Sequence, residues 1–297
     1  MLVDKEVGLN TRQFLVVSVM SNLYMIGCVF NKRKPMKTKA TIIISTIALF
    51  LTIELPGQDT IDYKTVFPSG ISVGYGQGLY SVKDEYISGE KYSGTLPYLN
   101  IEWVRFHNKN GYRLEFEYRN STNITNNNMS AEAKQIAFNQ DFIYPICHFS
   151  LFSKDVYAYL GPSVQVFYYD INYNFVTPGT FITPKTYGLI FSLGINTEFI
   201  YQVNRKLSIE GFLRSNLLSL SGKDVDPAIY DNDSPPGLLT VITVTKFDFD
   251  LSIRYYLVNR ISISLGYKFD LSRIDKWDPY VAASDNLIIS LNFKLRP

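Results

Sequence analysis

Residues 246–271 read KFDFDLSIRYYLVNRISISLGYKFDL. From Phe247 to Leu257, and again from Ile261 to Leu271, every second residue is apolar and most residues between them are polar or charged. A period of two places alternate side chains on opposite faces of a β-strand. The stretch therefore predicts two amphipathic strands joined by a tight turn at Val258-Asn259-Arg260, and residues 287–295 repeat the pattern.

The same alternation recurs back along the chain and predicts ten strands. They span residues 71–80, 96–106, 112–119, 132–146, 156–173, 187–203, 207–220, 239–257, 261–274 and 287–295. The predicted connections alternate in length. Long polar loops are expected at 81–95, 120–131, 174–186, 221–238 and 275–286, tight turns at 107–111, 203–206 and 258–260, and a moderate connection at 147–154. Long loops at one end and tight turns at the other are typical of a transmembrane barrel with an even strand number. We therefore expect a ten-stranded antiparallel up-and-down β-barrel, with eight or twelve strands as the alternatives, whose last strand pairs with its first.

Charge distribution between the two faces favours a membrane barrel over a soluble one. One face is rich in Leu, Ile, Phe and Tyr, and in a soluble barrel or sandwich with this pattern a wide apolar belt would be left exposed to water. The other face, predicted to point inward, collects the charges. These are Glu102, Arg113, Glu115, Glu117, Arg119, Asp141, Glu198, Glu210, Arg214, Asp248, Asp250, Arg254, Lys268, Asp270 and Lys294.

Composition excludes some functions. Lys and Arg number 29 and Asp and Glu 27, so no overall charge favours nucleic acid binding. Aromatic residues make up 15% of the chain, which suits a protein that lies at boundaries between water and lipid. The two cysteines, Cys28 and Cys147, form neither a disulfide framework nor a metal-ligand pattern.

The N-terminal region predicts export. Residues 36–57 combine Lys37 and Lys39 with an apolar run too short for a typical membrane-spanning helix, followed by a cleavage site before Gln58. We expect residues 36–57 to be a cleaved signal peptide, residues 58–297 to be the barrel domain, and residues 1–35 to be an over-extended start. A lipid anchor at Cys28, or an uncleaved anchoring helix, is the alternative.

Residues 58–297 resemble the outer membrane β-barrel proteins, or porin family, of Bacteroidetes-type bacteria. The resemblance is carried by the signal peptide ending near Pro56-Gly57-Gln58, by Tyr157-x-x-Leu160-Gly161-Pro162, and by the final strand LIISLNFKL at 287–295. It implies residence in the outer membrane, with membrane lipid and the barrel-insertion machinery as partners. The chain departs from such proteins at its end, because Phe293 lies four residues before Pro297 rather than at the terminus.

The inward charges admit two interpretations. They line a narrow pore, or they form a salt-bridged core, and a barrel of about ten strands is closer in size to those packed with side chains. The expected members of such a network are Arg113, Glu115, Glu117, Arg119 and Arg254.

Enzyme chemistry has little support in the sequence. A protease or lipase at the rim of the barrel requires a histidine base, and the only histidines, His107 and His148, fall in predicted periplasmic turns. Asp224, Asp226, Asp231 and Asp233 lie in one predicted loop, where they either bind Ca²⁺ through carboxylate oxygens or, as is more common, form a solvated acidic loop, and their spacing matches no EF-hand.

We therefore expect no catalytic residues, cofactor or metal, and a non-enzymatic scaffold or narrow pore in the outer membrane. A rim-site hydrolase and a secretion-complex component are the alternatives. Substrate and oligomeric state stay open.

Overall fold

The computed structural model describes residues 69–85, 88–107, 110–126, 129–177, 180–182, 185–225, 234–240, 244–275 and 279–295. The predicted signal peptide and the over-extended start lie outside the described residues. Within the described ranges there is no helix that is long and apolar enough to cross a membrane.

Twelve strands make up the described structure, and every pairing between them is antiparallel. They are β1 (Gly70–Asp84), β2 (Ser88–His107), β3 (Asn110–Asn126), β4 (Met129–Leu151), β5 (Lys154–Thr177), β6 (Thr180–Ile182), β7 (Lys185–Asn204), β8 (Leu207–Val225), β9 (Ser234–Thr240), β10 (Val244–Val258), β11 (Ile261–Ile274) and β12 (Tyr280–Lys294).

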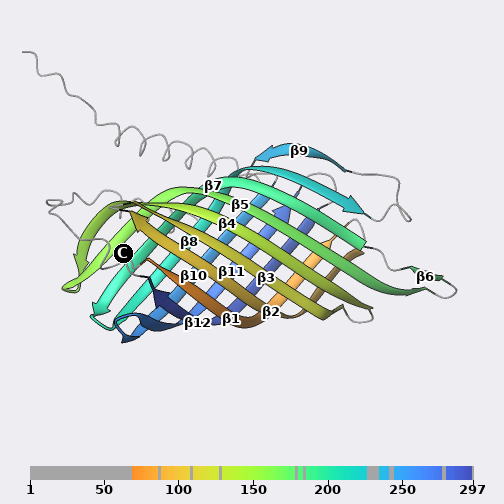
Figure 1. The fold of residues 1–297 in the computed structure, drawn as a ribbon. Coiled ribbons are helices and arrows are strands. Elements are labelled where there is room, and N and C mark those ends of the chain that lie inside the picture. Colours follow the sequence, from red (N-terminus) through yellow and green to blue (C-terminus); the bar gives the residue numbers. More distant parts are fainter. Residues whose placement is uncertain are drawn as a thin grey trace, which may run out of the picture. The chain divides into compact units, whose positions relative to one another are not determined.

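Ten of these strands form a closed barrel (Figure 1). Neighbours in sequence pair around the ring, and β1 pairs with β12 from Gly70↔Lys294 to Asp84↔Tyr280, which closes it. The short strands β6 and β9 extend β5 and β8 and do not belong to the ring. The predicted ten-stranded barrel and the predicted pairing of its last and first strands are confirmed.

The two ends of the barrel differ. The first residue of β1 and the last of β12 lie at one end, here called the terminal end, together with two-residue turns at 152–153, 205–206 and 259–260 and the connection from His107 to Asn110. The opposite, distal end holds the other connections. The predicted tight turns at 203–206 and 258–260 are confirmed, whereas the centre of the one predicted at 107–111 lies outside the described residues. The connection between β4 and β5, predicted to be moderate, is a two-residue turn.

The prediction of long distal loops is wrong for much of their length. β1 continues to Asp84 and β2 begins at Ser88, so most of the predicted 81–95 loop is strand, and only residues 127–128 separate β3 from β4. The reason is a reversal of polarity along each strand. In β1 the outward Ile71 and Val73 are exposed and apolar, whereas nearer the distal end the outward residue is Lys83 and the buried inward residues are Tyr80 and Val82.

This reversal divides the wall into an apolar zone and a polar zone. β5 has 24 residues, which at about 3.3 Å per residue and a tilt of about 45° gives a height of roughly 55 Å, about twice the ~25 Å apolar band of a membrane barrel. Large apolar side chains such as Leu287 (65% exposed) and Ile289 (63%) cover the terminal half. Towards the distal end the outward face ends in tyrosines followed by charges, as where the Tyr267 hydroxyl donates to Asp285.

One side chain completes the seam between β8 and β10. The direct register of these strands runs only from Leu207↔Tyr255 to Ser215↔Phe247, and a bulge in β8 follows. The fully buried Asn216 continues the ladder with its amide, because Nδ2 donates to the Val244 carbonyl at 2.8 Å and Oδ1 accepts from the Lys246 N–H at 2.7 Å.

Replacing Asn216 should therefore weaken the barrel at this seam. We expect Asn216→Ala to lower the free energy of unfolding by about 2 kcal/mol, because it leaves a buried carbonyl and a buried N–H unpaired. The measurement is urea unfolding of the barrel folded into lipid vesicles. Asn174→Ala is the matched control, since Asn174 is exposed and its amide donates only a 3.4 Å bond to Ser130. Equal losses for both variants would contradict the role given to Asn216.

Candidate functional site: a charged core inside the barrel

Arg214 on β8 is the hub of the barrel interior. Its side chain is 0% exposed. Nε donates to Asp141 Oδ1 at 3.0 Å, Nη1 to Asp248 Oδ2 at 3.0 Å and Nη2 to Glu115 Oε2 at 3.1 Å, and Nη2 also donates to Asp141 Oδ2. Glu115 lies on β3, four places from β8 around the ten-strand ring. Arg214 therefore ties together nearly opposite walls of the barrel.

A second set of ion pairs crosses the interior in the other direction. Lys268 on β11 donates from Nζ to Glu115 Oε1 at 2.8 Å and to Glu117 Oε1 at 2.6 Å, both on β3. Arg119 on β3 in turn forms an ion pair with Asp270 on β11, with Nη2 2.6 Å from Oδ2. β3 and β11 are again four places apart. Since all five side chains are buried, the pairs fill the middle of the lumen.

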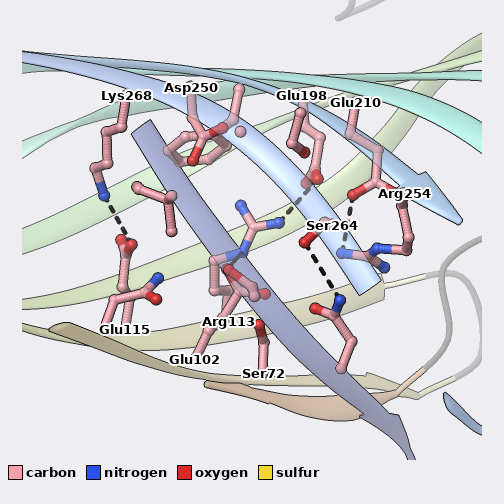
Figure 2. Close-up of a pocket in the computed structure, with 17 residues that line it drawn as sticks. Ser72, Glu102, Arg113, Glu115, Glu198, Glu210, Asp250, Arg254, Ser264 and Lys268 are labelled. Atoms are coloured by element: carbon pink, nitrogen blue, oxygen red, sulfur yellow. Dashed lines mark hydrogen bonds and ion pairs between the residues drawn. The ribbon is translucent and has the colours of Figure 1, made fainter. Parts of the chain in front are cut away.

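A third group lies towards the terminal end. Arg113 contacts Glu198 at 2.8 Å across the interior and Glu102 at 3.1 Å on the neighbouring strand β2, and Arg254 contacts Glu210 at 2.9 Å. Figure 2 shows Arg113 and Arg254 beside these carboxylates, on the wall of a cavity.

Two aromatic rings pack against the cationic groups of this core. Phe212 lies 4.7 Å from the guanidinium carbons of both Arg113 and Arg214, and the Tyr98 ring lies 4.8 Å from that of Arg119. Contacts of this kind attract a cation to the face of a ring. They hold the arginine side chains in place between their carboxylate partners.

Two of the residues predicted for this core have no ion pair among the described residues. Asp250 faces inward beside Lys268, whose ammonium is directed to Glu115 and Glu117. Lys294, the last residue of β12, lies at the terminal mouth and is partly exposed. The prediction that Lys294 belongs to the network is therefore corrected. The alternation places Lys294 on the inward face, but the strand ends there and the side chain lies at the mouth of the barrel.

Lys246 is a network member that the sequence prediction omits. Its Nζ contacts Asp248 Oδ1 at 2.7 Å and Asp270 Oδ1 at 3.5 Å, and the residue is buried. It has the same parity as Asp248, so extending the period-two pattern of β10 by two residues towards the N-terminus would have found it.

A layer of tyrosines fills the distal half of the lumen. Tyr80, Tyr92, Tyr169, Tyr173 and Tyr280 are almost completely buried and pack with Val82, Leu96, Ile124 and other apolar residues. The rings of Tyr169 and Tyr280 stack with centroids 4.2 Å apart, and those of Tyr92 and Tyr173 meet edge to face at 5.2 Å. The sequence prediction of a polar interior therefore holds for the middle of the barrel and is wrong for its distal half.

Both histidines lie at the terminal end. His107 is the last residue of β2 and is exposed. His148 lies near the β4–β5 turn, with Nε2 3.2 Å from Asp155 Oδ1 and its ring stacked on Tyr157. In the described part of the chain, no three His, Cys, Asp or Glu side chains are grouped so as to hold a metal ion. The aspartates of the predicted 221–238 loop have no described side chains.

Comparisons with known proteins give structural similarity without a family. No family model matches the chain, and no curated protein matches it. The similar solved structures are outer membrane β-barrel proteins. The outer membrane protease OmpT from Escherichia coli is 8% identical, with a TM-score of 0.48, over 80% of this chain and 100% of that one.

Two further solved structures are also similar to this chain. The translocator domain of autotransporter NalP from Neisseria meningitidis is 11% identical, with a TM-score of 0.41, over 86% of this chain and 95% of that one. Neisserial surface protein A is 10% identical, with a TM-score of 0.33, over 76% and 97%. The fold assignment here rests on the strand pairing itself.

The charged core supports a prediction about stability. Arg214→Met should lower the free energy of unfolding by about 3–5 kcal/mol, because it leaves three buried carboxylates without their shared cation. Arg254→Met is the matched control, since Arg254 pairs with one carboxylate and its side chain is 14% exposed. The loss should be at most half as large, as measured by urea unfolding in vesicles. If Arg254→Met lowered the free energy of unfolding as much as Arg214→Met, Arg214 would contribute no more to stability than an arginine with a single partner.

Proposed function

We propose that this chain is a non-enzymatic β-barrel of a bacterial outer membrane that presents its distal wall at the cell surface and does not conduct. The membrane setting is supported by the exposed apolar belt around the terminal half, where Leu265, Leu287 and Ile289 are each more than half exposed. A belt of this kind around a closed barrel exceeds the apolar patch that a water-soluble monomer tolerates.

The orientation follows from the arrangement of the ends. Membrane barrels of this kind place their termini and short turns in the periplasm. The terminal end of this barrel has both features, so the distal end, where β4, β5 and β8 rise beyond the apolar belt, would face the outside.

The observation that carries the scaffold over the pore is the ion pairing across the lumen. Arg214 and Lys268 connect β3 to nearly opposite strands, and the stacked Tyr169 and Tyr280 close the distal half behind them. An open pore requires a water-filled path along the axis, and large barrels of about sixteen strands provide one. Here the side chains of opposite walls meet in the middle, which supports a closed barrel.

The absence of catalysis is part of the proposal. Among the described residues, the one histidine–carboxylate contact is His148–Asp155, which lies at the end that would face the periplasm. A hydrolase acting at the cell surface would need its base at the distal rim. His148→Ala should therefore leave every cell-surface hydrolysis assay unchanged.

Conductance tests the closed interior. Purified barrel added to a planar lipid bilayer should give no single-channel steps above background, because the buried ion pairs and the tyrosine layer exclude a continuous water path. The double variant Tyr169→Ala, Tyr280→Ala lacks the stacked tyrosines of the distal half. It should also give no conductance steps, because the ion pairs across the lumen are still present. Regular steps from the unaltered barrel would overturn the scaffold and favour the narrow pore.

Cysteine labelling on intact cells tests orientation. In a Cys28→Ser, Cys147→Ser background, Glu85→Cys at the distal end should react with a membrane-impermeant maleimide, and Arg205→Cys at the terminal end should not. Both positions are exposed and in or beside turns, so they form a matched pair. Labelling of Arg205→Cys alone would reverse the orientation, and labelling of neither would contradict residence in the outer membrane.

A further inference from the structure

A cavity of about 70 Å³ lies inside the barrel, between the charged core and the terminal mouth (Figure 2). A buried water needs about 10–15 Å³ of such space, so the cavity has room for several waters or one small molecule. A second cavity at the mouth shares Ser72, Glu102, Arg254 and Asn292 with it, so the two cavities adjoin on the side of the terminal end.

The cavity wall carries more negative than positive groups. Five carboxylates line it, from Glu102, Glu115, Glu198, Glu210 and Asp250, against three cations, from Arg113, Arg254 and Lys268. Each cation is already paired: Arg113 with Glu102 and Glu198, Arg254 with Glu210, and Lys268 with Glu115 and Glu117. Glu115 also contacts Arg214, from outside the cavity wall. Glu198 therefore shares its cation with Glu102, and Asp250 has no ion pair among the described residues.

The unpaired acceptors lie on this cavity. Glu198 accepts from Arg113 with Oε1, but among the described residues its buried Oε2 has no hydrogen-bond partner, in a residue that is 2% exposed. The buried Asn100 Oδ1 likewise accepts no hydrogen bond there. Asp250 is partly exposed on the cavity wall and has no ion pair within the described ranges. A buried carboxylate oxygen without a partner is costly, and water can donate hydrogen bonds but does not neutralise the charges of Glu198 and Asp250.

We propose that this cavity binds a small organic ammonium ion, a short aliphatic amine or diamine that enters from the terminal end. Glu198, Phe212 and Asp250 are in register on the adjacent strands β7, β8 and β10. With strands about 4.8 Å apart, the backbones of the two acids are roughly 10 Å apart and their side chains point into the same lumen. A short diamine can donate to both.

A bare metal ion fits this arrangement less well. Ca²⁺ draws six to eight oxygens to within about 2.6 Å, and no three acidic side chains of the described chain are grouped closely enough for that. Ammonium groups at the two ends of a short chain suit dispersed acceptors, because each donates separate N–H bonds. The interior arginines lie over Phe212 and hold it between the two acids.

Calorimetry on the full barrel folded in detergent micelles tests the proposal. Titration with 1,4-diaminobutane to about 10 mM should give saturable binding at a dissociation constant in or below the millimolar range, whereas uncharged 1,4-butanediol and CaCl₂ should give none. Asp250→Asn should weaken diamine binding at least about tenfold. Asp170→Asn is the matched control, since Asp170 lies on the outer wall and pairs with Lys185, and its binding should be unchanged.

Stability gives a second readout that does not depend on finding the natural ligand. Without amine, Asp250→Asn should be at least as resistant to urea as the unaltered barrel, because it removes an uncompensated charge, and 1,4-diaminobutane should raise the urea midpoint only where Asp250 is present. No diamine binding, binding of CaCl₂ in its place, or equal diamine binding by Asp250→Asn would each overturn the proposal. None of these results depends on whether the barrel conducts.

Discussion

In a ring of only ten strands, long side chains from nearly opposite walls reach one another, and the rest of this structure depends on how they pair. Arg214 reaches from β8 to Glu115 on β3, and Lys268 reaches to the same carboxylate from β11. An ion buried without a partner would destabilise the barrel by several kcal/mol. The pairing therefore constrains the register of every strand that contributes to it, because a one-residue slip would turn these charges to the outer face of the barrel.

The outer surface imposes the second constraint. The outer face of the terminal half is apolar, as the proposed contact with lipid requires, which leaves the interior of that half to the polar and charged residues. Above the lipid the outward face meets water, as at Lys83 and Lys91, and the apolar residues move inward to form the tyrosine layer around Tyr169 and Tyr280. One strand thus carries two opposite amphipathic patterns, joined where the tyrosines and charges of the outer face mark the edge of the membrane.

These two constraints together give the interior three layers. Stacked tyrosines close the distal half, cross-lumen ion pairs close the middle, and a polar cavity with surplus carboxylates remains open towards the terminal end. A barrel built in this way suits a rigid support for the surface beyond the lipid better than a conduit. The wall of that cavity carries five carboxylates against three cations.

The sequence by itself determined the barrel, its strand number and the inward position of most of the charges, because a period of two is a local property that can be counted along the chain. It also located the tight turns, as at Val258-Asn259-Arg260. The distal ends of the strands were missed because their outward face is polar, so the alternation from which a lipid-facing strand is recognised fades and reverses. Only the tertiary structure decided which charges pair: Arg214 and Glu115 are 99 residues apart, and their contact depends on barrel closure and strand register. For the same reason Asp250 and Arg119, alike in the sequence pattern, differ in the fold, where Arg119 meets Asp270 and Asp250 faces a cavity.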